Sequence, residues 1–330
     1  MEAIVSYKKA GLPNNNKEVK GISFLLKEWR KSKYLYIMMA PVLLYFFIFS
    51  YMGIYGYVIA FQDYFPSARS TNFFQIFIPP NAQWVGFKNF TDFLQGAYIY
   101  RTIRNVLAMN ILGIIFAFPA PIILALLLNE LRAKYFKKTV QTISYIPHFI
   151  SMVVVTGFIL DFTSSNGLFN KLIVALGGTK INFMTEPTWF WPIYIGSGIW
   201  QELGWGSIIY LATIAAIDSS LYEAATVDGA NRWKQILHIT IPGLLPTAII
   251  LLIMRIGHMM SGGFEKVLLL YNPSIYETAD IISTYVYRVG FANMNYGFAS
   301  AVGLFNAVIN LIMVISANKI GKKLTDTSLW

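Results

Sequence analysis

Long apolar runs separated by short polar stretches are the dominant pattern along this chain of 330 residues. A helix that crosses a membrane needs about 20 consecutive, mostly apolar residues, and six runs reach that length. Most of them contain no Asp, Glu, Lys or Arg, but the fourth contains Glu202 and the fifth contains Arg255 and His258. The runs predict six transmembrane helices, over 34–61, 105–129, 139–160, 188–217, 242–264 and 297–318.

Lysine and arginine are distributed unevenly between the two sides that six spans create. They concentrate before the first span, between the second and third, between the fourth and fifth, and after the sixth. Because positive residues in short connections mark the cytoplasmic side of a membrane protein, both termini are predicted to be cytoplasmic. The same distribution accounts for the net charge of +10 without a nucleic-acid partner, since residues that bind nucleic acid cluster on one solvated face.

The first apolar run is predicted to stay in the protein as a helix. It lies behind 33 mostly polar residues, is too long for the apolar part of a signal peptide, and ends without a small-residue cleavage pattern. The predicted organisation is a cytoplasmic basic segment over 1–33, a six-helix membrane domain over 34–320 and a cytoplasmic tail over 321–330.

Composition narrows the class of protein further. Hydrophobic residues make up 56% of the chain and charged residues 13%, whereas a soluble domain averages about 25% charged residues. A chain without cysteine can form no disulfide, iron–sulfur cluster or zinc–thiolate site. The three histidines lie on separate segments, so no metal site is expected. These observations predict an all-α polytopic membrane protein.

The two long outer connections, 62–101 and 265–296, are rich in Phe, Tyr, Asn and Pro. One interpretation is that they form interfacial helices whose aromatic rings lie at the level of the lipid headgroups. The other is that they form a docking surface for an external partner. The residues that would border such a contact are 84–90, Tyr271, Tyr276, Tyr285 and Tyr287.

The inner connection 219–242 has the local chemistry of two short helices joined by a turn. Ser220 and Glu223 have the spacing of a capping box, which satisfies unpaired N–H groups at the start of a helix. Gly229 permits a sharp turn that a residue with a Cβ resists, and Pro242 restarts the path into the membrane. An ordinary amphipathic connector with a turn at residues 228–229 is the alternative interpretation.

The order of residues in this connection resembles a specific element, the EAA loop of binding-protein-dependent ABC importer permeases. Glu-Ala-Ala is followed by Asp-Gly-Ala and then by an isoleucine and a proline, although Ile241 stands where leucine is usual before the proline. The resemblance implies that this loop couples the chain to an ATPase. The residues that match are Glu223, Ala224, Ala225, Asp228, Gly229, Ala230, Ile239 and Pro242.

Softer motifs extend the resemblance along most of the chain. The segment 84–90 is similar to a stretch in the first outer loop of sugar importer permeases, and 102–107 is similar to the start of their next helix, with Val106 in place of threonine. Residues 146–147 and 167–170 also fit. Together these segments resemble the maltose-type permease family, nearest to the subfamily linked to complex oligosaccharides.

The resemblance implies a type I ABC importer permease fold with cytoplasmic EAA coupling helices, in the plasma membrane of a bacterium. The implied partners are a second related permease subunit, two cytoplasmic ATPase subunits, an extracellular solute-binding protein, an oligosaccharide substrate and membrane lipid. ATP and magnesium would be bound by the ATPase subunits. This chain is expected to bind no cofactor and to be no enzyme, because it contains no G-x-x-x-x-G-K-[ST] phosphate-binding motif.

Other functions remain open from the sequence alone. The importer could carry a solute other than a sugar, or the chain could be a self-sufficient secondary carrier or a polytopic membrane enzyme. Neither HExxH nor GxSxG occurs in the chain. The EAA loop argues against the last two alternatives, because such proteins need no docking element for a separate motor.

Polar side chains inside the predicted spans mark a candidate substrate path. An ionisable residue within a span costs about 2.5–3.5 kcal/mol on insertion scales, so it usually faces protein or a water-filled cavity. Helix rise places several of these groups near mid-membrane, where transporter sites lie. A structural Glu202–Arg255 pair that joins two helices is the competing interpretation. The candidates are Trp200, Gln201, Glu202, Trp205, Arg255, His258, Asn306 and Asn310.

Overall fold

A computed structural model describes residues 22–64, 83–325 and 328–329 of the chain. Most of these residues are helical. The chain divides into two compact units, Met1–Gly56 and Tyr57–Trp330, and the second contains both candidate functional regions.

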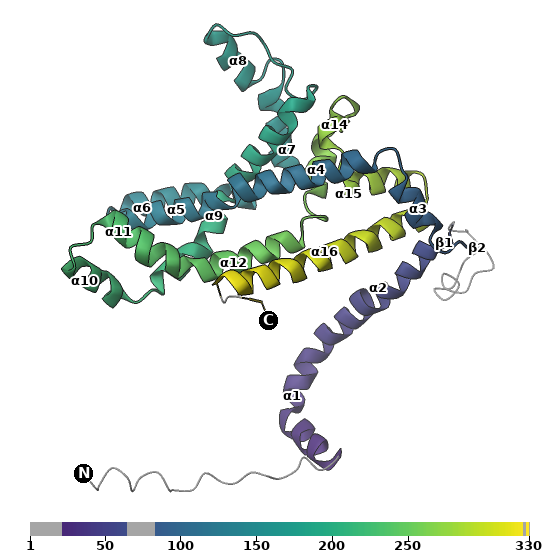
Figure 1. Ribbon diagram of the computed structural model, residues 1–330, viewed down its shortest axis with the longest axis horizontal. Coiled ribbons are helices and arrows are strands. Elements are labelled where there is room, and N and C mark those ends of the chain that lie inside the picture. Colours follow the sequence, from purple (N-terminus) through teal and green to yellow (C-terminus); the bar gives the residue numbers. More distant parts are fainter. Residues whose placement is uncertain (1–21, 65–82, 326–327, 330) are drawn as a thin grey trace. The chain divides into compact units, whose positions relative to one another are not determined.

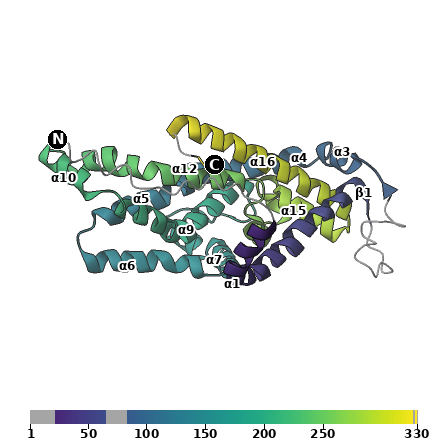
Figure 2. The same cartoon turned by 90° about the horizontal axis from the view of Figure 1, so that it is seen from below.

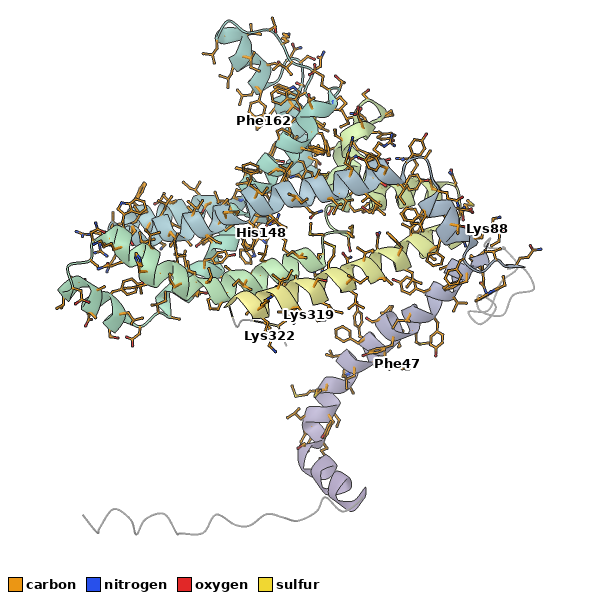
Figure 3. All side chains as sticks on the ribbon, viewed as in Figure 1. Phe47, Lys88, His148, Phe162, Lys319 and Lys322 are labelled. Atoms are coloured by element: carbon orange, nitrogen blue, oxygen red, sulfur yellow. The ribbon has the colours of Figure 1, made fainter. Side chains whose placement is uncertain are left out.

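The first unit is a long apolar helix with two interruptions. α1 (Ile22–Phe46) changes direction at Ser32, whose φ of −111° and ψ of 17° are not helical. A π-helical turn (Phe47–Tyr51) and α2 (Met52–Ile54) continue the helix, and Phe47 is labelled in Figure 3. A candidate membrane span covers Ser32–Phe61, which confirms the first predicted run.

The second unit combines a small antiparallel hairpin with a series of helices. The hairpin and the helices before residue 216 are β1 (Gln62–Asp63), β2 (Gln83–Trp84), α3 (Lys88–Leu94), α4 (Ile99–Leu112), α5 (Pro119–Glu130), α6 (Lys134–Tyr145), α7 (Met152–Thr163), α8 (Leu168–Ala175) and α9 (Phe190–Ala215). The later helices are α10 (Ser219–Val227), α11 (Arg232–Gln235), α12 (Ile241–Gly257), α13 (Phe264–Leu270), α14 (Tyr276–Ala279), α15 (Ile282–Val286) and α16 (Tyr296–Thr325).

Tighter and wider helical turns connect several of these elements. Narrow 3-10 turns cover Tyr55–Phe61, Ile146–Phe149, Pro187–Trp189 and Pro273–Ile275. Wider π-helical turns cover Gly113–Ala117, Ile236–Thr240 and Tyr287–Ala292. The turn at Gly113–Ala117 joins α4 to α5 and the turn at Ile236–Thr240 joins α11 to α12 without a break, whereas Tyr287–Ala292 extends α15 and ends before α16.

The number of spans agrees with the sequence prediction. In the part of the chain that the structure describes, five helices are long and apolar enough to cross a membrane. The number rises to six if the pair formed by Pro187–Ala215 and Ser219–Val227, which meet at 68°, counts as one broken span. The second and sixth runs correspond to the candidate spans Ile99–Glu130 and Tyr296–Lys323.

The third predicted run, 139–160, is wrong as a single helix. α6 ends before a 3-10 turn, and Ile150 and Ser151 are extended, with ψ of 130° and 149°. Pro147 supplies no backbone N–H to continue a helix, so the chain restarts as α7 after the break. The candidate span in this region is Met152–Ala175. α7 and α8 project from the layer that contains α4 and α5 (Figure 1).

The fifth predicted run also needs correction. α11, the π-helical turn and α12 form one candidate span, Arg232–Gly257. Pro242 therefore does not restart the chain but lies in the first turn of α12, where proline is tolerated. The helix ends at Gly257, so His258 follows it and Arg255 lies close to its end rather than deep within a longer span.

The outer connection 265–296 packs one side of its helices into the core of the second unit. α13, α14 and α15 supply a large part of the buried apolar cluster that also includes residues of α4, α7, α9 and α16. The buried members from this connection are Val267, Leu270, Ile275, Ala279, Ile281 and Ile282.

A buried carboxylate attaches this folded connection to α4. Asp280 is 0% exposed, and its Oδ2 accepts hydrogen bonds from Arg101 at 2.9 Å and from Arg288 at 2.8 Å. The Thr284 hydroxyl donates to Oδ1 at 3.0 Å, and the Asn105 amide donates to the Asp280 carbonyl oxygen at 2.9 Å. The network holds α4 and the 265–296 connection together.

The two ends of the second unit are distinct in Figures 1 and 2. α10, α11 and the connection between α5 and α6 lie at one end, and α3 with the hairpin lies at the other. Figure 3 marks Lys88 at the end that carries α3. The connections predicted to be cytoplasmic thus lie together, opposite a segment predicted to be external.

Candidate functional site

The connection 219–242 folds as two short helices and a turn, as its sequence predicts. The helix start differs from the prediction, however, because Asp218 and not Ser220 caps α10. The Asp218 Oδ1 accepts a hydrogen bond from the Ser220 backbone N–H at 2.9 Å, while Asp218 itself is extended. This hydrogen bond lowers the pKa of the Asp218 carboxyl. An ionised carboxylate there also interacts favourably with the helix dipole.

Gly229 makes the turn between α10 and α11. Its φ is +76°, in the left-handed region that residues with a Cβ rarely adopt. The Ala230 N–H donates to the Ala225 carbonyl oxygen at 2.8 Å, which closes the end of α10. The predicted reason for glycine at this position is therefore confirmed.

Side-chain hydrogen bonds hold the two short helices against each other. Gln235 is 7% exposed, and its Nε2 donates to the Thr226 hydroxyl at 3.0 Å. The hydroxyl groups of Tyr222 and Thr240 lie 2.9 Å apart and share a hydrogen bond. The connection is therefore a preformed unit joined to the start of α12.

The outer surface of this connection carries both charge and apolar side chains. Val227 is 88% exposed and Trp233 is 73% exposed. Such a surface is suited to docking on another protein. Among the matched residues, Glu223, Ala224, Asp228, Gly229 and Pro242 are exposed, whereas Ala225, Ala230 and Ile239 are partly buried.

A cavity of about 600 Å³ lies beside α9 and contains part of the predicted substrate path. Gln201, Glu202 and Arg255 line it together, as the sequence predicts for groups that share one path. Tyr194 and Lys266 line the same cavity. Gln201 is 5% exposed, and its amide donates to the Ile150 carbonyl oxygen at 3.3 Å, next to the break between α6 and α7.

Glu202 pairs with a histidine and not with Arg255. The His148 Nδ1 lies 3.2 and 3.1 Å from the two carboxylate oxygens of Glu202. The His148 ring stacks on Trp205, with 4.5 Å between centroids and an interplanar angle of 2°. Figure 3 places His148 where α7 leaves the helix layer. The described residues form no Glu202–Arg255 ion pair, so the competing structural interpretation of these two residues is wrong.

Lys266 occupies a buried position on the cavity wall. Its side chain is 5% exposed, its Nζ donates to the Tyr194 carbonyl oxygen at 2.9 Å, and it lies 4.7 Å from the centroid of the Tyr194 ring. Burial lowers the pKa of Lys266 to about 8, and the charge of Glu202 opposes that shift. The sequence assigned residue 266 to an outer loop, and nothing in its local pattern shows that α13 turns back into the core.

The other predicted path residues line different cavities. Trp200 lies on an apolar cavity of about 810 Å³ between α7, α8 and α9; Phe162, on the same cavity, is labelled in Figure 3. His258, Asn306 and Asn310 line a third cavity, of about 720 Å³. The Asn310 side chain is engaged there, since it accepts from the Met260 N–H at 3.1 Å and donates to the Ser261 hydroxyl at 2.7 Å.

Comparison with known proteins identifies the class of this chain. The description "Binding-protein-dependent transport system inner membrane component" belongs to a family whose pattern matches residues 109–326. The chain belongs to this family. The permease is 42% identical over 312 residues to protein LplB of Bacillus subtilis, covering 94% of this chain and 95% of that one.

Two further similar proteins carry names that describe transport. The permease is 44% identical over 308 residues to the polygalacturonan/rhamnogalacturonan transport system permease protein YteP of Bacillus subtilis, covering 93% of each chain. It is also similar to a chain in the crystal structure of a bacterial alginate ABC transporter in complex with an alginate pentasaccharide-bound periplasmic protein. That similarity has a TM-score of 0.83 at 42% identity and covers 92% of the permease and 99% of the other chain.

These similarities establish what kind of transporter the protein serves. It is a membrane-spanning permease subunit of an ABC importer, with the type I fold. The alternative of a self-sufficient secondary carrier is therefore wrong. Among the described residues, no group of three or more His, Cys, Asp or Glu side chains could hold a metal ion.

Proposed function

We propose that this permease is one of two related membrane subunits that import oligosaccharides delivered by an extracellular solute-binding protein. Two cytoplasmic ATPase subunits would bind ATP and magnesium and drive the cycle. The names of YteP and of the alginate transporter support a saccharide substrate. Both termini, α10 and α11 would face the cytoplasm of a bacterial cell, and membrane lipid would surround the apolar spans.

The observation that carries this proposal is the preformed helix–turn–helix at 219–242. Its exposed side chains offer a contact surface, and the Gln235 and Tyr222 hydrogen bonds tie that surface to α12. In our proposal Glu223 faces a basic residue of an ATPase subunit. Closure of the ATPase pair then moves α10 and α11, and α12 transmits the movement as a rigid body to produce alternating access.

The substrate path in this proposal is the 600 Å³ cavity beside α9. It receives side chains from α9, α12 and α13, so relative movement of these elements changes its shape. Gln201, Glu202 and Arg255 are the predicted path residues that meet there. Trp205 contributes indirectly, because its ring stacks on the histidine that binds Glu202. The remaining candidates, Trp200, His258, Asn306 and Asn310, would act outside this cavity.

Replacing Gly229 by valine tests the coupling role. A residue with a Cβ at a left-handed position costs about 1–2 kcal/mol, which would distort the turn without removing a span. We expect Gly229→Val to insert and assemble with its partners but to lose ATP-driven uptake in proteoliposomes that contain the complete importer. Uptake and ATPase activity stimulated by the loaded binding protein are the measurements.

Gly177 provides a matched control. It has a φ of +85°, and as at Gly229 no heavy atom lies within 4 Å of the point that a Cβ would occupy. Gly177→Val therefore imposes the same backbone strain in the connection between α8 and α9, away from the proposed ATPase contact. Equal loss of uptake in both variants, or normal uptake in Gly229→Val, would contradict the coupling role.

A further inference from the structure

Arg255 faces the cavity with its hydrogen-bonding capacity unused. Among the residues that the structure describes, its guanidinium donates no hydrogen bond and forms no ion pair with a carboxylate. It packs against the π-helical turn after α4, where a Cβ on Gly113 would lie 2.8 Å from Nη2. The glycine therefore leaves room for the guanidinium beside two cavities, of about 600 and 250 Å³.

Lys266 faces the same 600 Å³ cavity and also lacks an anionic partner. Its one hydrogen bond to a described residue goes to a neutral carbonyl oxygen, that of Tyr194. An ammonium group has three N–H donors, so two are left for another acceptor. The face of the Tyr194 ring offers partial compensation through a cation–π contact.

Among the described residues, neither acidic side chain on this cavity forms an ion pair with Arg255 or Lys266, although the charge of Glu202 acts on Lys266 from a distance. Glu202 binds His148 through both carboxylate oxygens. Glu265 is exposed and forms no ion pair with any residue that the structure describes. A buried or intramembrane cation without a partner is costly and usually marks a functional position. The missing component is therefore an anion that enters from outside the chain.

We propose that Arg255 and Lys266 form a subsite for a carboxylate group of the transported saccharide. The inference rests on the proposed function, since it assigns a substrate class to the same cavity. Guanidinium presents a planar pair of N–H donors that matches a carboxylate, and lysine adds a point charge. The phenol groups of Tyr194 and Tyr210, which line the same wall, add polar contacts for a sugar ring.

Direct binding distinguishes a charged substrate from a neutral one. The probes are tri-galacturonate and its fully methyl-esterified form, which differ in charge but share the sugar backbone. Calorimetry would measure their binding to the intact importer complex in nanodiscs, without the solute-binding protein. Tri-galacturonate is expected to bind at least about tenfold more tightly than the ester, because hydrogen bonds to an ionised carboxylate are stronger than those to a neutral ester.

Substitutions at Arg255 and Lys266 test whether these two residues cause the difference in affinity between tri-galacturonate and its ester. Arg255→Met and Lys266→Met should each remove most of the preference for the acid, whereas Lys266→Arg should keep it. Lys171→Met, at an exposed position in α8, is the control and should bind like the unaltered protein. Stoichiometric co-purification of the partner subunits shows that each variant assembles.

Several results would overturn the carboxylate subsite. One is equal binding of acid and ester by the unaltered complex, including the case in which neither binds. Another is an undiminished preference for the acid in both Met variants. Retention of phosphatidylglycerol that depends on Arg255 and blocks tri-galacturonate would assign the cations to lipid phosphate. None of these results depends on ATP, so the Gly229→Val experiment still tests the importer function separately.

Discussion

Lys266 shows how strongly a single position can depend on the chain around it. In isolation it is one lysine near the start of an outer connection, but α13 carries it into the core and onto the cavity wall. There, burial lowers the pKa of its ammonium group to about 8. The cavity therefore gains a cation whose charge changes close to physiological pH.

Binding of an acidic saccharide should depend on pH because of this lysine. Lys266 is charged below about pH 8 and neutral above it, so tri-galacturonate affinity should fall as the pH rises through 8. The other titratable or charged groups that line the cavity are Tyr194, Glu202, Tyr210, Arg255 and Glu265, with His148 bound to Glu202.

Calorimetry between pH 6.5 and 9.5 would measure this dependence. Lys266→Arg should move the decline to higher pH, because guanidinium stays protonated. A decline that persists unchanged in Lys266→Met would assign it to another group. The same series in His148→Gln shows whether the histidine contributes.

The candidate site was only partly predictable at the level of residues. Glu202 and Arg255 were identifiable because an ionisable residue stands out within an apolar run, and the structure brings both to one cavity. The hydrogen-bond partner of Glu202 could not be predicted from the sequence. It is His148, which lies 54 residues away on the segment between α6 and α7. Tyr194 and Lys266 gave no signal, because a tyrosine in a span and a lysine in a connection are both ordinary.

At the level of elements, short helices with many side-chain hydrogen bonds do much of the organising. The Asp280 network is the clearest case, because one carboxylate receives Arg101 from α4 and Arg288 from the turn after α15. It explains how a connection of short helices can stay packed in the core. In α10 and α11, the neutral hydrogen bond from Gln235 to Thr226 holds two short helices together.

Removing the charge of Asp280 should destabilise the second unit. Asp280→Asn leaves two arginines beside a neutral group, and breaking a buried ion pair in this way costs about 3–5 kcal/mol. Since the arginines are 26% and 31% exposed, we expect about 3 kcal/mol, at the lower end of that range. Thermal unfolding of the detergent-purified complex is the measurement. Glu277→Gln, at an exposed neighbouring position, should have little effect, and an equally large loss there would contradict the argument.

Loosening the contact between α10 and α11 should reduce the efficiency of transport if these helices dock on the ATPase subunits as proposed. Gln235→Ala removes the buried amide that bonds to Thr226, a loss of about 1 kcal/mol for a neutral hydrogen bond. We expect the complex to assemble and hydrolyse ATP but to import less substrate per ATP. Lys171→Ala, at an exposed position in α8 and outside the proposed ATPase contact, is the control. An unchanged ratio of uptake to hydrolysis in Gln235→Ala would show that the hydrogen bond plays no part in coupling.

At the scale of the whole molecule, the distribution of apolar residues predicts how many spans there are and roughly where they lie. Six long runs correspond to five or six candidate spans because hydrocarbon thickness sets a minimum helix length. The break at Ile150–Ser151 was missed because the prediction followed the apolar length of residues 139–160, although Pro147 within that run is a helix-breaking signal. The core position of 265–296 also escaped prediction, because aromatic and polar residues suit both an interface and a well-bonded interior.

The orientation of the molecule can be tested directly, because the chain contains no cysteine. A single introduced cysteine is then its only thiol. Val227→Cys, at a position 88% exposed in α10, should react with a membrane-impermeant maleimide only from the cytoplasmic side. Phe87→Cys, 71% exposed at the opposite end, should react only from outside. Labelling of both positions from one side would contradict the proposed topology.

An external docking role for the segment 84–90 can be tested with the same approach. Trp84 and Phe87 are 66% and 71% exposed and both rings contact Phe61. A photocrosslinker at position 87 should capture the solute-binding protein, whereas one at the half-buried Tyr285 should do so less. Capture of lipid alone at position 87 would favour the interfacial interpretation for this segment.

The π-helical turn at Ile236–Thr240 has a consequence for the rotational phase of the fifth candidate span. A π-helical turn contains one residue more than an α-helical turn, and each residue of an α-helix rotates its side chain by about 100°. Deleting one residue there would convert it to an α-helical turn and leave Arg255 facing the cavity, whereas deleting one residue from the α-helical part of α12 before Arg255 would turn that side chain by roughly 100°. The π-helical turn thus accommodates one residue without changing the angular register between the surface of α11 and the wall of the cavity.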